Sequence, residues 1–241
     1  MAEGVDLQRM RRSVAFERLL CRLFASGEEE WILKGGYAME LRIQSARMTK
    51  DIDLSLPASA LKSDLEVDEQ NLLLQEMLQE AAGLDLADCF TYQIGSPMLD
   101  LDAAPYGGAR FPVRGSIAGK LYVRFHLDIG IGDVLDEPFE NFEGADWLAF
   151  ASIAPGNYRG LSREGQFAEK LHAYTRPRDG GSNSRVKDLI DMVLLIDLGL
   201  DSVRLQKDLN KTFARRKSHL LPASLEAPPD FWRNPYEALA R

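Results

Sequence analysis

Two periodicities of hydrophobic and polar residues predict the secondary structure of this chain. Apolar residues recur every three or four positions, as in helices that bury one side, in five segments: 7–25, 68–82, 162–175, 185–198 and 201–214. Polar–apolar alternation or a short apolar run predicts strands at 31–33, 51–56, 89–94, 111–114 and 121–129. Gly35-Gly36 lies at the turn between the first of these strands and a helix that begins near Tyr37.

The order of these elements predicts an α+β fold in two lobes. All the predicted strands precede residue 145, and only helices follow it. We therefore expect a mixed α/β lobe with an N-terminal helix at 1–145 and a helical lobe at 146–241. The segment 95–109 is expected to be a loop, and the proline-rich tail from residue 222 is expected to pack loosely.

The composition is that of an average globular chain, with 241 residues, of which 45% are hydrophobic and 27% charged. It excludes a wholly disordered or collagen-like protein. Two cysteines, Cys21 and Cys89, are too few for a secreted disulfide scaffold and cannot make a zinc site alone. No apolar run approaches a membrane span, and arginines interrupt any signal-like segment near the N-terminus, so we expect a cytoplasmic protein without membrane contact.

Three aspartates are candidates for a metal site. Asp51 and Asp53 occupy alternate positions of one predicted strand, so both carboxylates project from the same face. Their mutual repulsion is relieved by a cation, and Mg²⁺ prefers carboxylate and phosphate oxygens. Asp128 on the strongest predicted strand is a third acid, with Asp133 as a less favoured rival, and His126 shares the face of Asp128. Taken alone, an Asp-x-Asp strand is more often a solvated edge.

The glycine pair supplies a candidate phosphate site. Glycines at a turn that enters a helix let backbone N–H groups approach a phosphate, and the helix N-terminus favours its negative charge. Lys34 lies directly beside Gly35 and Gly36. A Gly-Gly pair by itself usually marks a tight turn, so the combination with the aspartate strand carries the prediction.

Four motifs follow one another in the chain. They are LKGGYAM at 33–39, RMTKDIDL at 47–54, AEKLHA at 168–173 and SRVKDLID at 184–191. Together they resemble the AbiEii/AbiGii toxin family of abortive-infection and toxin–antitoxin systems, a branch of the minimal nucleotidyltransferase superfamily. The likeness extends over about residues 30–198.

The resemblance implies a nucleotidyltransferase fold, in which a mixed-sheet lobe is followed by a helical lobe. It also implies the reaction: an acceptor attacks the α-phosphate of an NTP bound with Mg²⁺, or with Mn²⁺, and pyrophosphate leaves. Asp51, Asp53 and Asp128 would hold the metal, and Asp128 would also position or deprotonate the acceptor. Lys34, Gly35 and Gly36, with Arg47 or Thr49, would bind the nucleotide phosphates.

Cations of the helical half complete the implied site. Lys170, Arg185 and Lys187 can offset the charge that develops on the triphosphate. Lys187 and Asp191 are four positions apart, so they can meet on one helical face, with Asp188 next to them. A surface ion pair is the simpler interpretation, but the resemblance assigns Lys170 and Lys187 to catalysis and Arg185 and Asp188 to nucleotide binding.

The charge distribution bears on the acceptor. The net charge of −8 disfavours a general nucleic-acid coat protein, but the charge is uneven. Residues 51–102 hold 12 acids and one base, whereas 204–219 hold six Lys or Arg and one acid. A basic helix end is usually only solvated. The functional alternative is contact with an RNA acceptor, such as a tRNA 3′ end, to which some relatives in the family add nucleotides.

Three function classes remain open on the sequence. The first is a nucleotidyltransferase toxin that acts on RNA or protein and has a cognate antitoxin. The second is a nucleotidyltransferase that modifies a small molecule, and the third is a partner-binding protein that keeps the fold without catalysis. The intact Asp51/Asp53 pair argues against the third class, and the basic segment favours the first over the second.

Overall fold

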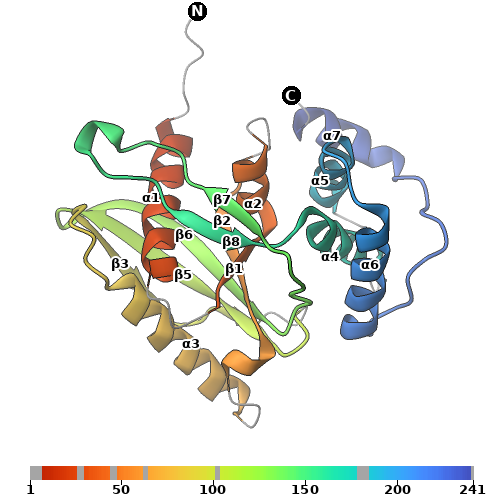
Figure 1. Cartoon of the computed structure of the whole chain (residues 1–241), viewed down its shortest axis with the longest axis horizontal. Coiled ribbons are helices and arrows are strands. Elements are labelled where there is room, and N and C mark those ends of the chain that lie inside the picture. Colours follow the sequence, from red (N-terminus) through yellow and green to blue (C-terminus); the bar gives the residue numbers. More distant parts are fainter. Residues whose placement is uncertain are drawn as a thin grey trace, which may run out of the picture. The chain divides into compact units, whose positions relative to one another are not determined.

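The structure is a computed structural model that describes residues 7–25, 30–43, 48–61, 65–100, 104–177 and 185–239. The chain divides into two compact units (Figure 1). The first unit comprises Met1–Gln44, Met48–Asp133 and Glu140–Gly160; the second comprises Ser45–Arg47, Val134–Phe139 and Leu161–Arg241. A mixed sheet with helices forms the first unit and helices form the second, so the predicted α+β class is confirmed.

One mixed sheet is the framework of the first unit. Its strands within the described ranges are β1 (Ile32–Lys34), β2 (Asp51–Leu56), β3 (Phe90–Ile94), β4 (Leu99–Asp100), β5 (Gly108–Ile117), β6 (Lys120–Ile131), β7 (Glu140–Glu143) and β8 (Asn157–Gly160). Their order is β3-β5-β6-β2-β1-β8-β7, and β4 pairs with β5. The pairs β2–β6 and β1–β8 are parallel and the others antiparallel. The two central strands, β2 and β6, therefore run side by side in the same direction.

Alternation along the strands separates an apolar face from a polar one. On β2, Ile52, Leu54 and Leu56 are fully buried, whereas Asp51 and Asp53 point to the opposite face. The apolar face packs against α1 (Leu7–Ala25), α2 (Gly35–Arg42) and α3 (Val67–Ala82) in one hydrophobic core (Figure 1). Helices thus cover one side of the sheet, and the acidic residues lie on the other.

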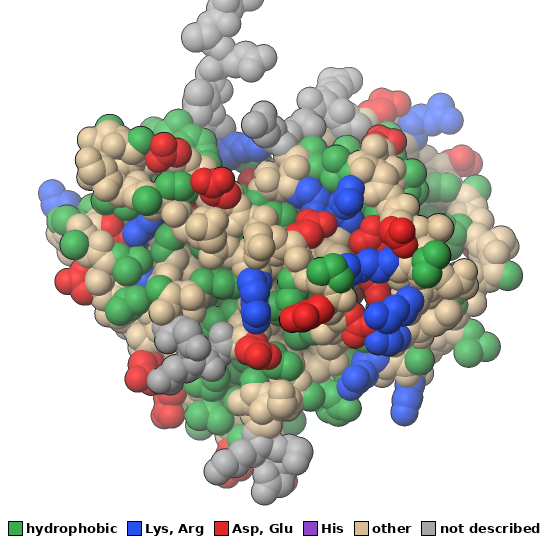
Figure 2. All heavy atoms as spheres, viewed as in Figure 1, with side chains coloured by type: hydrophobic (Ala, Val, Ile, Leu, Met, Phe, Trp, Pro, Cys, Tyr) green, Lys and Arg blue, Asp and Glu red, His purple; other side chains and the backbone are tan. Residues whose placement is uncertain are grey.

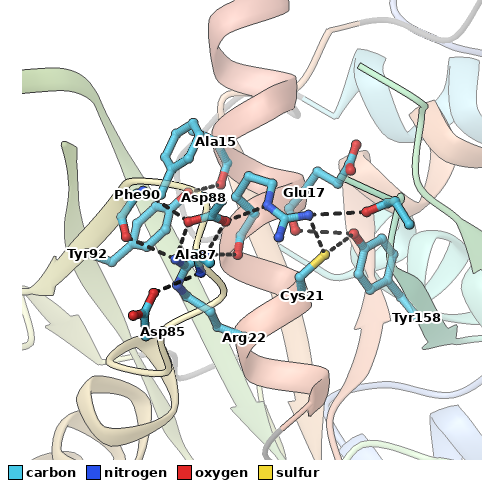
Figure 3. A network of polar contacts seen from close by, with 12 residues as sticks. Ala15, Glu17, Cys21, Arg22, Asp85, Ala87, Asp88, Phe90, Tyr92 and Tyr158 are labelled. Carbon is cyan, nitrogen blue, oxygen red and sulfur yellow. Dashed lines mark hydrogen bonds and ion pairs between the residues drawn. The ribbon is translucent and has the colours of Figure 1, made fainter. Parts of the chain in front are cut away.

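A buried ionic network ties α1 to the segment before β3. Arg18 Nε donates to Asp88 Oδ2 at 2.7 Å, and Arg22 donates to both carboxylate oxygens, at 2.9 and 2.6 Å. Figure 3 shows this network around Asp88, which also accepts from the Phe90 backbone N–H. The two guanidinium groups and this N–H outweigh the effect of burial and lower the pKa of Asp88 to about 2. The carboxylate is therefore ionised and fully paired.

Three short strands were not predicted. β4 and the first residues of β5 lie in the segment 95–109, so the expectation of a loop is wrong there. β7 and β8 move the boundary between the units. β7 and β8 form an antiparallel pair, and β8 joins the sheet beside β1. The first unit therefore extends to Gly160 rather than to residue 145. β7 and β8 have only four residues each, too few for polar–apolar alternation to identify them in the sequence. The strands predicted at 111–114 and 121–129 are longer than expected and form the β5–β6 hairpin.

The second unit is helical, as predicted. Its helices are α4 (Arg163–Thr175), α5 (Val186–Asp197), α6 (Ser202–Arg216) and α7 (Arg233–Leu239), and short 3-10 turns in the two units lie at Ala58–Ala60, Ala149–Ala151 and Asp230–Trp232. The expectation of a loosely packed tail is wrong at Trp232, which is 2% exposed. Its ring packs edge-on against Tyr174 of α4, 5.8 Å between centroids. Trp232 therefore belongs to the core of this unit, whereas Leu225 and Phe231 of the same tail are exposed.

The helices of the described ranges are too short or too polar to cross a membrane.

Candidate active site

Asp51, Asp53 and Asp128 share the polar face of the two central strands. In the parallel pairing of β2 with β6, Asp53 lies beside Asp128 and Asp51 lies beside His126. Neighbouring strands are about 4.8 Å apart, so the three carboxylates occupy adjacent positions on one face of the sheet. The structure therefore brings together the three aspartates that the sequence selected.

Arg110 on β5 is a member of this group that the sequence analysis missed. It lies directly across from Asp128 in the β5–β6 pairing, and donates from Nε and Nη2 to the two carboxylate oxygens at 2.8 and 2.7 Å. Its Nη2 is also 3.9 Å from Asp51 Oδ2. Its hydrogen bond to Asp128 raises the pKa of Arg110 above its ordinary value. The hairpin register, once known, would have identified this residue.

His126 contacts the first aspartate. Its Nδ1 lies 3.1 Å from Asp51 Oδ1, and the side chain is 39% exposed. The prediction that His126 shares the acidic face is thereby confirmed. Asp51 is thus approached by the His126 imidazole from the neighbouring strand β6 and by the Arg110 guanidinium from β5, one strand further away.

The glycine pair begins α2 and lies against Asp53. Gly35 has a φ of +66°, a left-handed conformation that glycine adopts without strain, and a Cβ there would lie 2.0 Å from Asp53 Oδ2. The Gly36 N–H points at the same oxygen, with N···O 3.4 Å. Only glycine at position 35 allows the strand-to-helix turn to approach the carboxylate this closely.

Lys34 has a fixed partner on the sheet. Its Nζ forms an ion pair with Asp133, whose Oδ2 also accepts a hydrogen bond from Ser55 Oγ at 2.5 Å. The Asp133 side chain is fully buried. Asp133 is the less favoured candidate for the third acid, and it holds the ammonium group of Lys34 instead. Asp128 lies beside Asp53 on the face that also bears Asp51. This geometry favours Asp128 as the third acid.

Thr49 braces the start of β2. Its hydroxyl donates to the Asp51 backbone carbonyl at 3.2 Å, and its own carbonyl accepts from Arg12 Nη1 at 3.1 Å. Its backbone N–H donates to Glu40. These contacts fix the first residue of the aspartate strand. Arg47, the other residue assigned to phosphate binding, lies outside the described residues.

In the second unit Lys170 is the centre of a buried ion-pair group. Its Nζ donates to Asp191 Oδ2 at 2.6 Å and lies 3.6 Å from Asp188 Oδ1. Arg185 reaches the other oxygen of Asp188 at 3.4 Å. The expected contact between Lys187 and Asp191 is wrong, because Asp191 faces Lys170 while Lys187 is exposed on α5. Asp188 and Asp191 therefore orient the ammonium group of Lys170.

The donor set of the first unit suits a magnesium ion. Carboxylate oxygens are the protein ligands that Mg²⁺ prefers, and a single face supplies Asp51, Asp53 and Asp128. Among the described residues, no three His, Cys, Asp or Glu side chains already converge on one point. Arg110 holds both oxygens of Asp128 instead. The residues fit the metal chemically, provided that this guanidinium moves from Asp128.

Comparison with known proteins gives one family. The family described as "Nucleotidyl transferase AbiEii toxin, Type IV TA system" matches residues 18–240 of the chain. No curated protein sequence gives a significant match.

The solved structures that are similar to the chain include the following two. The nucleotidyltransferase toxin MenT4 from Mycobacterium tuberculosis has a TM-score of 0.61 at 16% identity, over 88% of this chain and 67% of that one. JHP933 from Helicobacter pylori has a TM-score of 0.49 at 16% identity, over 88% of this chain and 81% of that one. The likeness to MenT4 concerns the fold, which confirms the nucleotidyltransferase-type architecture expected from the sequence.

Proposed function

Because the chain belongs to the AbiEii nucleotidyltransferase toxin family, we propose that it transfers a nucleoside monophosphate from an Mg²⁺-bound NTP to an RNA acceptor. Membership makes it a nucleotidyltransferase with an NTP as substrate and an antitoxin as partner. The metal, the acceptor and the residue roles below are our proposal. The observation that carries it is the register of β2 with β6, which sets Asp53 beside Asp128 on the face that also bears Asp51.

The proposed reaction is an in-line displacement at the α-phosphorus. A hydroxyl oxygen of the acceptor forms the new P–O bond, the bond to the β-phosphate oxygen breaks, and pyrophosphate leaves with the electron pair. The acceptor proton passes to Asp128, which lies beside Asp53 in the strand register. Mg²⁺, when bound to Asp51, Asp53 and Asp128, supplies positive charge for the triphosphate oxygens.

The turn at Gly35 supports phosphate binding by the backbone. It brings the first N–H groups of α2 to the edge of the aspartate group, with Gly36 N 3.4 Å from Asp53 Oδ2. A helix N-terminus and a glycine turn together favour an anion. Lys34 is the N-cap residue of this helix, and its ammonium group is held by Asp133. We assign Lys34, Gly35 and Gly36 to the triphosphate.

The residues of the second unit have a secondary part in this proposal. Lys170 is fixed by two carboxylates and so presents an oriented ammonium group, while Lys187 and Arg185 are exposed. We keep Lys170 and Lys187 as cations for the nucleotide. Arg185 and Asp188 also remain assigned to nucleotide binding, with Asp188 orienting Lys170.

An RNA acceptor is favoured by the basic side chains along α6, which gather on the surface drawn in Figure 2. Much of their charge is paired, however. Lys207 and Lys211 both contact Asp136, and Arg216 contacts Glu169. α6 therefore offers less free positive charge to a phosphate backbone than its sequence indicates. A tRNA is one RNA that an enzyme of this kind can use.

The experiment is a transfer assay on total RNA. Purified protein is incubated with each α-labelled NTP, Mg²⁺ and RNA, beside the isosteric variant Asp51→Asn/Asp53→Asn. Label on RNA, lost in the variant and on removal of Mg²⁺, supports the proposal. Label on protein or on a small molecule assigns another acceptor, and the absence of transfer to every acceptor tested contradicts the proposal. Growth arrest on expression that the variant does not cause would connect the activity to toxicity.

A further inference from the structure

Two arginines face each other on the polar side of the sheet. In the antiparallel pairing of β5 with β6, Arg114 lies directly opposite Arg124, and both side chains are exposed. On the next strand, β3, the exposed Gln93 is the register partner of Arg114. Gln93, Arg114 and Arg124 thus form a row across three strands, which we call the arginine row.

Neither arginine of the row has a carboxylate partner among the described residues. By contrast, Arg110 of the same hairpin is paired with Asp128, and the buried Arg18 and Arg22 of α1 are paired with Asp88. Like charges directly opposite on a sheet destabilise it, whereas opposite charges stabilise it. The fold therefore keeps an unfavourable pair at this position.

The arginine row lies on the same face as the three aspartates. Arg124, His126 and Asp128 alternate with the buried Phe125 and Leu127, so their side chains project together. Asp128 lies four positions after Arg124 on β6, so their Cα atoms are about 13 Å apart along the strand. This is the distance of a neighbouring subsite, beyond the contacts that hold the reacting phosphate.

We propose that the arginine row binds the backbone phosphates of the RNA acceptor and leads its end to Asp128. The inference rests on the proposed function and deepens it, because it places the acceptor on the sheet of the first unit. Guanidinium groups bind phosphate oxygens in pairs, and a phosphate near both relieves their repulsion. Gln93 and the flanking register partners Thr91 and Ser116 are polar, which suits a nucleic-acid backbone better than a protein interface.

A binding experiment tests the row without catalysis. The full chain is titrated with a short 5′-fluorescein-labelled single-stranded RNA, without NTP, at several salt concentrations between roughly 50 and 200 mM. We expect Arg114→Gln/Arg124→Gln to weaken binding about tenfold at the lowest salt. The slope of log affinity against log salt should also fall by about 1.4, since each lost contact to single-stranded RNA removes about 0.7.

The control removes the same charge elsewhere. Arg9→Gln/Arg11→Gln removes two positive charges from α1, which packs against the apolar face of the sheet, opposite the face that bears the row. Its salt slope should equal that of the unmodified chain. An equal loss in both double variants would reduce the effect to net charge and overturn the proposal, as would an unchanged slope in the row variant.

A second variant separates binding from folding. Arg124→Glu sets an acid opposite Arg114, which should leave the melting temperature equal or higher. RNA binding should nevertheless fall more than in Arg124→Gln. If the two arginines have only a structural role, Arg124→Glu should bind RNA as tightly as the unmodified chain does. That result would overturn the proposal.

The failures of this proposal and of the proposed function are distinguishable. If the unmodified chain labels RNA but the row variant keeps its RNA affinity and its salt slope, the acceptor lies elsewhere and only the row is wrong. If the row variant loses RNA binding but the chain transfers no nucleotide to RNA, the row stands and the RNA transferase assignment fails. A raised KM for NTP with unchanged RNA binding assigns the row to the nucleotide and overturns the proposal.

Discussion

Arg110 faces Asp128 across the β5–β6 pair and donates hydrogen bonds to both of its carboxylate oxygens. The same guanidinium lies 3.9 Å from Asp51. A single cationic side chain therefore spans two of the three aspartates and neutralises charge where a divalent ion would bind. This makes Arg110 a competitor of the metal for the carboxylates.

Replacing Arg110 should therefore strengthen metal binding. We expect Arg110→Gln to bind Mn²⁺, as a paramagnetic stand-in for Mg²⁺, several-fold more tightly than the unmodified chain, because the carboxylates lose their internal counter-charge. Electron paramagnetic resonance titration without NTP measures this directly. Arg110→Lys, which keeps the charge but not the two-pronged contact, should lie between the two. Weaker Mn²⁺ binding in Arg110→Gln would mean that the arginine organises the aspartates for the metal.

Gly35 should tolerate no side chain. In Gly35→Ala, the left-handed φ costs about 1–2 kcal/mol, and the new Cβ meets Asp53 as well. We expect transfer to fall about a hundredfold, since a carboxylate displaced by an ångström is misplaced for the reaction. Gly119→Ala is the matched control: its φ is +77°, but nothing lies within 4 Å of a Cβ there. Gly119→Ala should lose a similar amount of stability but retain its transfer activity. If both variants lose transfer activity equally, the displacement of Asp53 is not the cause of the loss.

The sequence predicts the aspartate face well because that face depends on one local property. Asp51 and Asp53 lie two positions apart, and strand alternation alone orients them. Arg110 and the arginine row depend instead on which strands pair and in which register. The β5–β6 register shifts at an irregularity between Gly115 and Ser116, and a strand predicted only at 111–114 does not define it. The meeting of Asp53 with Asp128 is not local either, because β6 pairs in parallel with β2, a strand far earlier in the chain.

Charged residues show the same limit in the second unit. Helical spacing correctly allows Lys187 and Asp191 to meet on α5, but a neighbouring helix offers Asp191 a better partner in Lys170. A buried carboxylate gains more from a buried ammonium group than from an exposed one, because water screens the exposed pair. Local periodicity cannot rank these partners, whereas the packing of α4 against α5 does.

The Arg18–Arg22–Asp88 network should dominate the stability of the first unit. Asp88→Asn leaves two buried guanidinium groups without their counter-ion, and we expect a loss of about 3–5 kcal/mol in the free energy of unfolding by urea. Asp85→Asn alters an exposed carboxylate in the same segment and should cost less than about 0.5 kcal/mol. Since the pKa of Asp88 is lowered from 3.8 to about 2, its contribution should persist above pH 3.8 and disappear as the pH falls towards 2.

Lys170 is a case in which structural and catalytic roles can be separated. Lys170→Ala removes the cation from the buried Asp191 and should destabilise the second unit by about 3–5 kcal/mol. Lys170→Met/Asp191→Leu replaces the pair with apolar side chains and should restore most of that stability. Transfer should remain low in the double variant. If activity returns together with stability, Lys170 acts only in folding, and its assignment to the nucleotide is wrong.

Glu17 should make the stability of the first unit fall as the pH rises from 4.5 to about 7. The residue is 2% exposed, and its Oε2 has no hydrogen-bond partner among the described residues. Burial raises the pKa of Glu17 from 4.5 to about 7, against the opposing effect of Arg18. Between these two values the unfolded chain has released the proton that the folded chain retains, so the free energy of unfolding decreases with pH.

Glu17→Gln isolates this effect, because the amide has the shape of the protonated acid and cannot ionise. Below pH 4.5 the two proteins should have similar stability, and above pH 7 the variant should be more stable by on the order of 3 kcal/mol. Urea unfolding between pH 4 and 8, with the difference between the two proteins plotted against pH, gives the comparison. A difference that does not change with pH would mean that Glu17 is already ionised in the folded protein and that its charge is stabilised by its surroundings.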